Sequence, residues 1–247
     1  MKKAVITLLG SIITLLTNGQ YPFISSGKIQ YEKRTNQFKL LDGWNMEASM
    51  RDEVKRTTTK ILVDRFDLLF SGDQSLYKLS SPNNENKYFA APTPSETDFT
   101  IKDIAQRQLS FQKDVFGTTF NVEDTLSGFQ WKIFDETRTI AGFECKKAVT
   151  RVFDSVYVIA FFTTEILGNH GPENFCGLPG MILEIAIPRL YTTWVATKLE
   201  LNKPSQAELT RTIKGKKLTN EEYLRDLNKI GAELPADAKK TLLMFCL

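Results

Sequence analysis

Residues 171–185 read Gly-Pro-Glu-Asn-Phe-Cys-Gly-Leu-Pro-Gly-Met-Ile-Leu-Glu-Ile, and they join a loop of restricted geometry to an abrupt apolar segment. Each proline fixes φ near about −65° and donates no amide hydrogen, whereas each glycine can adopt positive φ. Residues 171–180 therefore form neither regular helix nor central strand, and we expect a rigid loop. Residues 181–187 are almost wholly apolar, which predicts a strand covered on both faces.

This loop has two interpretations. It is either a tight corner that lets the following strand enter the core, or a contact surface for a ligand or partner. On the second interpretation the contact residues are Gly171, Pro172, Phe175, Gly177, Leu178, Pro179, Gly180 and Met181.

The rest of the chain alternates apolar and polar residues in short runs, which predicts strands joined by tight turns. Residues 71–74 fit a hairpin turn, and residues 44–56 have apolar side chains at helical spacing. Residues 219–222 fit a helix capping box, and a second short helix is expected near Pro235. The predicted fold is mainly β: a single curved antiparallel sheet, similar to a half-barrel, with one N-terminal helix and C-terminal helices.

The N-terminal residues predict export. Lys2 and Lys3 precede an apolar and hydroxyl run over residues 4–16, and residues 17–19 offer a cleavage point. We expect a signal peptide at 1–19 and a single β-rich domain at 20–247, in which 205–247 is a helical C-terminal extension. The apolar run is shorter than the about 20 residues of a spanning helix, and no cysteine near the cleavage point would carry a lipid. The expected location is therefore periplasmic or secreted, with no membrane span in the mature chain.

Composition narrows the classes of partner. Removal of residues 1–19 lowers the formal charge from +3 to +1, so no nucleic-acid partner is expected. Hydrophobic residues make up 42% of the chain, enough for a core, and the 17 Phe residues make that core aromatic. The aromatic residues of the strands have two interpretations. They are core residues, or, if the sheet is open, some of them line an apolar concave groove. The candidates are Phe143, Tyr157, Phe161 and Trp194.

The motif at residues 177–182, Gly-Leu-Pro-Gly-Met-Ile, resembles the hallmark of the GLPGLI family and differs from it only at Met181. Residues 26–32, 131–133 and 139–148 also resemble segments of that family. The family comprises exported Bacteroidota-type proteins without an established activity, so the resemblance implies an architecture and a location but no reaction. By strand pattern alone, the chain also looks like the lipoprotein-carrier half-barrel.

Few residues offer catalytic chemistry. His170 is the single histidine, which excludes metal sites built from several imidazoles, and we predict neither a metal nor a cofactor. His170, Glu173 and Cys176 lie close in sequence and contain the groups of an activated thiol. Cys145 and Cys176 are the expected disulfide pair in an oxidising compartment, the alternative being two buried thiols. Cys246 would then be left over.

Three functions fit these observations. The leading hypothesis is a non-enzymatic cell-envelope protein that binds an apolar or lipid-like ligand on a concave sheet. The alternative is a protein-interaction accessory of an outer-membrane system, which contacts another envelope protein through the loop and an edge strand. A cysteine-dependent enzyme built on Cys176 and His170 is the least favoured hypothesis.

Overall fold

The computed structural model describes residues 23–81, 91–153, 155–213, 215–234, 239 and 241–246. The predicted signal peptide and the start of the helix expected near Pro235 lie outside this part of the chain. The strands are β1 Ser26–Asn36, β2 Ile61–Ser71, β3 Gln74–Ser81, β4 Phe99–Asp103, β5 Gln108–Val115, β6 Thr118–Thr125, β7 Lys132–Ile140, β8 Phe143–Val152, β9 Val156–Thr163, β10 Met181–Ile187 and β11 Thr192–Glu200.

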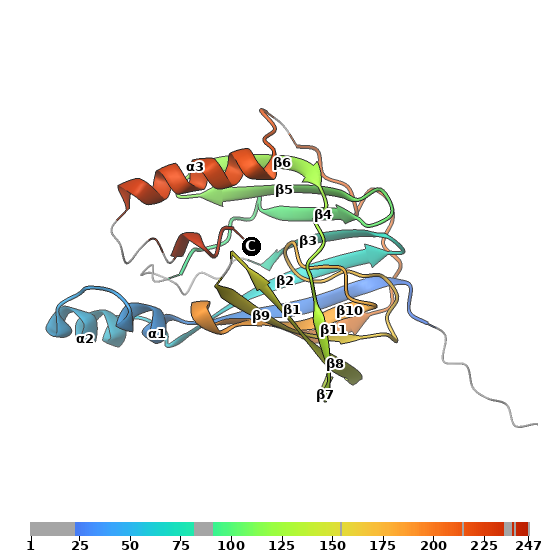
Figure 1. Ribbon diagram of the computed structural model, residues 1–247, viewed down its shortest axis with the longest axis horizontal. Coiled ribbons are helices and arrows are strands. Elements are labelled where there is room, and N and C mark those ends of the chain that lie inside the picture. The colour runs from blue at the N-terminus through green and yellow to red at the C-terminus, as the bar shows by residue number, and fades with distance from the viewer. Residues whose placement is uncertain are drawn as a thin grey trace, which may run out of the picture.

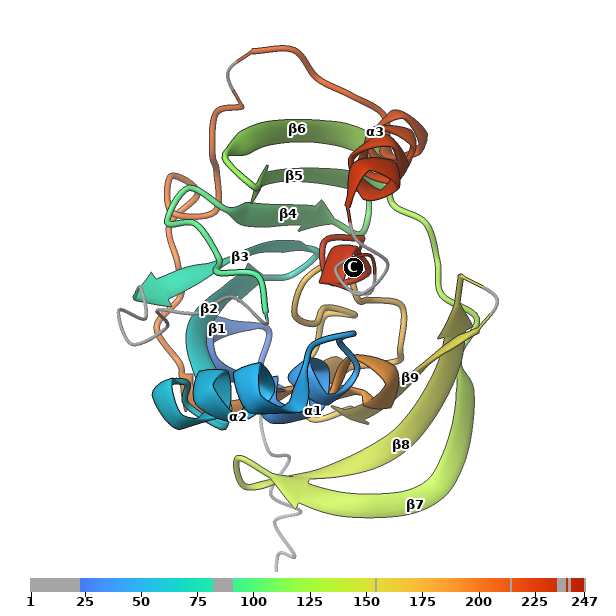
Figure 2. The same ribbon diagram turned by 90° about the vertical axis from the view of Figure 1, so that its left-hand side faces the viewer.

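Within the described ranges, these eleven strands form one antiparallel sheet in the order β6-β5-β4-β3-β2-β1-β11-β10-β9-β8-β7. Two meanders, β1 to β6 and β7 to β11, meet where β1 pairs with β11. Although β6 and β7 are consecutive in the chain, they form the two opposite edges of the sheet, and residues 126–131 cross between them. Figure 2 shows the sheet curving like a C that stays open between these edges. The prediction of a mainly β protein with one large antiparallel sheet is confirmed.

The turns follow the sequence signals. Gly72 lies at the tip of the β2–β3 hairpin with φ of 57°, a conformation that glycine adopts without strain. Burial alternates residue by residue along β1 and β5, because one face of each strand packs on the core inside the curve.

The helices are short: α1 Gln37–Asp42, α2 Ala48–Thr57, the 3₁₀ turn η1 Pro188–Leu190 and α3 Asn220–Glu233. The single N-terminal helix expected over residues 44–56 is not found as such. Gly43 caps the end of α1, α2 starts only after Glu47, and Met50, assigned to the apolar face, is 60% exposed. The capping box at Thr219 and Glu222 is confirmed as the start of α3.

The inside of the curve is filled. The loop before β10 contributes Phe175 and Leu178 to the main core, and Met181 at the start of β10 joins them; none of the three is more than 1% exposed. The C-terminal residues also lie inside the curve, between α3 and the central strands (Figures 1 and 2), and Met244 packs against the same core. In the described part of the chain, the concave face is thus a packed interior in which side chains leave discrete pockets. No helix in the described part of the chain is both long and apolar enough to cross a membrane.

Candidate functional site

The loop of residues 171–180 folds as an internal corner because two of its glycines are sterically required. A Cβ atom on Gly180, which has φ of 149°, would lie 2.0 Å from the carbonyl oxygen of Thr163. A Cβ atom on Gly171 would lie 2.9 Å from Cβ of Ile182. Among the predicted contact residues, Gly177 and Pro179 are exposed, whereas the buried ones are Gly171, Pro172, Phe175, Leu178, Gly180 and Met181.

A buried ammonium group holds this loop in place. Lys102 extends from β4, and its Nζ donates to the carbonyl oxygens of Gly171 at 2.6 Å, Glu173 at 2.7 Å and Phe175 at 3.0 Å. Burial lowers the pKa of Lys102 to about 8, so the group is still mostly charged at neutral pH. Trp131 donates from Nε1 to the carbonyl of Cys176 at 2.9 Å and fixes the other side of the loop.

Three lysines that sequence reasoning missed face the inside of the curve. Lys33 on β1 and Lys113 on β5 occupy strand positions that alternation assigns to apolar residues, whereas Lys102 on β4 follows the polar phase of its strand and is nevertheless buried. Each of the three is at most 8% exposed. The signal was present in the sequence: Lys33 follows Ile29 and Tyr31 at two-residue spacing. A lysine in the apolar phase of a strand indicates a buried partner or a polar cavity.

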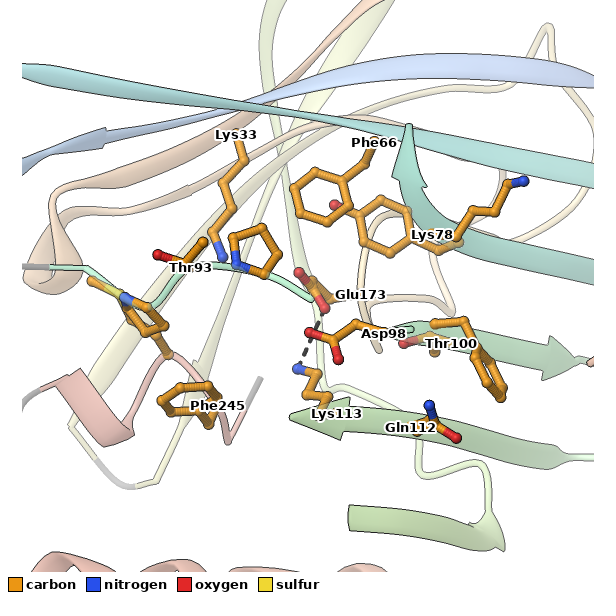
Figure 3. A pocket seen from close by; sticks show the side chains of 15 residues that line it. Lys33, Phe66, Lys78, Thr93, Asp98, Thr100, Gln112, Lys113, Glu173 and Phe245 are labelled. Atoms are coloured by element: carbon orange, nitrogen blue, oxygen red, sulfur yellow. Dashed lines mark ion pairs between the residues drawn. The ribbon is translucent and has the colours of Figure 1, made fainter. Parts of the chain in front are cut away.

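Lys33 and Lys113 line a cavity of about 40 Å³, which we call the lysine pocket (Figure 3). Lys113 pairs with Glu173 at 3.3 Å, and Asp98 lies beside this pair. Burial of Glu173 opposes its ionisation, but the charges of Lys113, Lys33 and Lys102 prevail and hold its pKa below the usual value. Burial raises the pKa of Asp98, whose carboxylate accepts the amide hydrogens of Ser95 and Asp114.

A second pocket, which we call the seam pocket, lies beside the β6 edge of the open sheet. Its volume is about 180 Å³, and its walls come from the 126–131 crossing, the end of β8, α3 and the internal loop. Asn174 from the loop also lines it, with a buried Oδ1 atom that has no hydrogen-bond partner in the structure. The apolar residues that line it include Leu126, Phe129, Val152, Phe153, Phe175 and Leu224.

The two pockets lie on opposite sides of one wall. Consecutive loop residues divide between them, because Glu173 lines the lysine pocket whereas Asn174 and Phe175 line the seam pocket. The C-terminal segment divides in the same way, with Phe245 on one side and Cys246 on the other. The internal loop is therefore shared by both candidate sites.

The four aromatics proposed for a concave groove are not gathered into one surface. Trp194 is buried beside Lys33, whose Nζ lies 5.0 Å from the indole centroid. Phe161 is buried under the guanidinium of Arg138, at 3.8 Å from the ring centroid. Phe143 is half-buried, and Tyr157 is 58% exposed.

The cysteines are free thiols, so the structure does not form the expected bond between Cys145 and Cys176. The two belong to different hydrophobic clusters, Cys145 on β8 in the main core and Cys176 in the cluster beneath α3. Burial raises the pKa of both thiols, that of Cys145 to about 12, which disfavours the nucleophilic thiolate.

The groups of the hypothetical cysteine site have other partners. His170 is buried and lies with Nε2 3.0 Å from the carbonyl oxygen of Gly72, so Nε2 carries the hydrogen and donates it. Burial, assisted by the charge of Lys102, lowers the pKa of His170 to about 4. Glu173 is engaged by Lys113. Among the described residues, no hydrogen bond links Cys176 Sγ to either side chain.

Comparison with known sequences gives one family match. The profile of a family described as "Protein of unknown function (Porph_ging)" matches residues 150–184. The match spans the end of β8, β9, the internal loop and the start of β10, and so includes the motif at 177–182. Its family name differs from the one that the motif suggested. No protein with a curated description matches the chain.

Comparison with solved structures supports the fold. Two structures of a protein named PNGF-II, in the C2 and P21 space groups, are similar to this chain with TM-scores of 0.54 and 0.52. Each aligns at 16% identity over 81% of this chain. The chain spans about a third of the length of those structures, since the alignment covers 32% of each. At this level of identity the similarity concerns the fold alone.

Proposed function

We propose that this chain is an exported, non-catalytic protein of the cell envelope that binds an apolar, lipid-like ligand in the seam pocket. The observation that carries the proposal is an apolar pocket of about 180 Å³ beside the unpaired β6 edge of the sheet, between that edge and the end of β8. A cavity of about 150 Å³ lined by apolar side chains is large enough to bind benzene. The seam pocket therefore accepts a six-carbon chain or ring, or the end of a longer lipid.

The polar atom in the pocket refines the ligand. Asn174 Oδ1 is buried without a partner, so a ligand with a hydroxyl or amide N–H group would satisfy it. Burial of each methylene contributes about 0.8 kcal/mol, from which the cost of association is subtracted. For a six-carbon alcohol we expect a dissociation constant on the order of 1 mM, and tighter binding for a longer chain.

Hexan-1-ol is a suitable probe, with binding followed by NMR shifts of the backbone amides around the pocket. Ser127→Trp places an indole at the pocket wall and is expected to abolish the shifts. Gln130→Trp is the matched control, because Gln130 is exposed on the same crossing segment but is not part of the pocket wall. Equal hexan-1-ol binding by both variants would contradict the proposed site.

A further inference from the structure

Lys33 and Lys102 are both buried lysines, but their surroundings differ. Lys102 Nζ donates to three carbonyl oxygens. No hydrogen bond or ion pair connects Lys33 Nζ to any other described residue, and its neighbours are the rings of Trp194 at 5.0 Å and Phe66 at 6.0 Å. Asp64, its partner across the β1–β2 pair, is affected by its charge but lies beyond ion-pair distance. Lys33 Nζ therefore faces the lysine pocket without a hydrogen-bond acceptor from the described residues.

Two further hydrogen-bonding groups near Lys33 lack partners. Tyr77 Oη, which also belongs to the lysine pocket, and Trp194 Nε1 are both buried, and no hydrogen-bond partner of either is found in the described structure. The indole of Trp194 lies close enough to Tyr77 to affect its pKa, but the two groups do not form a hydrogen bond of good geometry. An ammonium and an indole N–H only donate. This corner of the cavity therefore has more donors than acceptors.

The carboxylates that line the cavity do not correct this imbalance. Glu173 is paired with Lys113, and Asp98 accepts two backbone amide hydrogens. Figure 3 shows Lys33 entering the cavity from β1 on the side of Glu173, whose carboxylate pairs with Lys113. The charge of Lys33 also acts on Glu173, but the two form no ion pair. We propose that the lysine pocket is a second binding site, which takes a carboxylate group and holds it with Lys33 Nζ and Tyr77 Oη.

The size of the cavity sets the size of that group. About 40 Å³ accommodates a few heavy atoms, which suits a carboxylate but not a large ligand. Pro92, Pro94 and Phe245 line the cavity and would contact whatever the carboxylate is attached to. This proposal does not depend on ligand binding in the seam pocket, so an experiment that refutes one of the two binding sites leaves the other untouched.

Acetate is the smallest probe of the site, and the chain's three tryptophans make the readout simple. Sodium acetate is titrated against sodium chloride at equal ionic strength and pH 7, and the indole N–H resonance of Trp194, assigned with Trp194→Phe, is followed by NMR. We expect a saturable acetate shift with a dissociation constant on the order of 10 mM. Lys33→Met is expected to abolish the shift, whereas Lys146→Met, which removes an exposed lysine of β8, retains it.

Tyr77→Phe is a second variant that tests the same site if Lys33→Met does not fold. Because Tyr77 Oη has no partner in the free protein, this variant should unfold at the same denaturant concentration as the parent but bind acetate about tenfold more weakly. The proposal is overturned if acetate causes no saturable shift, if chloride causes the same shift, or if binding survives Lys33→Met or Tyr77→Phe unchanged.

Discussion

Replacement of Lys102 by methionine tests whether one cation organises the internal loop. The substitution keeps a long unbranched side chain but leaves the carbonyls of Gly171, Glu173 and Phe175 without their donor. An unpaired buried acceptor costs about 1–3 kcal/mol. Three unpaired acceptors therefore cost about 3–9 kcal/mol, and relief from burying the ammonium offsets only part of the upper end of that range. We expect a net loss of about 3 kcal/mol in the free energy of unfolding.

Urea unfolding at pH 7, below the Lys102 pKa of about 8, measures this loss. Lys146→Met is the control, because Lys146 is exposed, and its effect should stay within about 0.5 kcal/mol. Hydrogen exchange locates the damage: the amide of Gly177, which donates to Asn169, should lose protection before the central strands do. If Lys102→Met unfolds at the same urea concentration as the parent, the ammonium does not hold the loop and our reasoning is refuted.

Three further predictions follow from buried groups. His170, the single histidine, should stay neutral until about pH 4 by NMR. Its pKa in the folded protein lies below the ordinary value of 6.5, so it contributes stability that is present above pH 6.5 and is lost as the pH falls toward 4. The loss amounts to about 3 kcal/mol in the free energy of unfolding. His170→Gln should flatten the stability profile in that window, and an unchanged profile would contradict the assignment. Gly180→Ala should destabilise the chain by about 3 kcal/mol in denaturant unfolding, whereas Gly128→Ala, with open space around its Cβ, should be neutral; similar effects of the two would argue against the tight corner. Intact mass spectrometry after alkylation in denaturant, without reductant, should find three alkylated thiols, whereas a single alkylated thiol, with an unalkylated mass about 2 Da below the all-thiol value, would reveal a disulfide that the structure lacks.

Much of the sheet was predictable because strand periodicity is a local property. Alternation along β1 and β5 and the glycine turn at Gly72 follow from neighbouring residues alone. The N-terminal helix was misjudged because apolar spacing over residues 44–56 does not locate a helix start: residues 44–47 are not helical, and α2 begins only after Glu47, while a separate helix, α1, ends just before Gly43. Capping signals proved more reliable than spacing, as Thr219 shows at the start of α3.

The candidate sites were only partly predictable. The glycines and prolines of the loop predicted that it is rigid, but they did not predict its position inside the curve. That position depends on hydrogen bonds from Lys102 and Trp131, which lie far from the loop in sequence. The lysine pocket needs β1, β4 and β5 to meet the loop, and the seam pocket needs the end of β6, the end of β8, α3 and the loop to come together. Lys33 and Lys113 could have been flagged because each breaks the apolar phase of its strand. Their ion-pair and cavity partners required the three-dimensional fold.

Native mass spectrometry tests the central claim, an apolar ligand in the seam pocket, most directly. The full chain is exported to a bacterial periplasm and purified without detergent, in parallel with Ser127→Trp and Gln130→Trp. We predict a discrete adduct of lipid-like mass on the parent and on Gln130→Trp, and a bare protein for Ser127→Trp. A bare parent chain that also fails to take up added long-chain alcohol, or an adduct that Ser127→Trp retains, would contradict the claim.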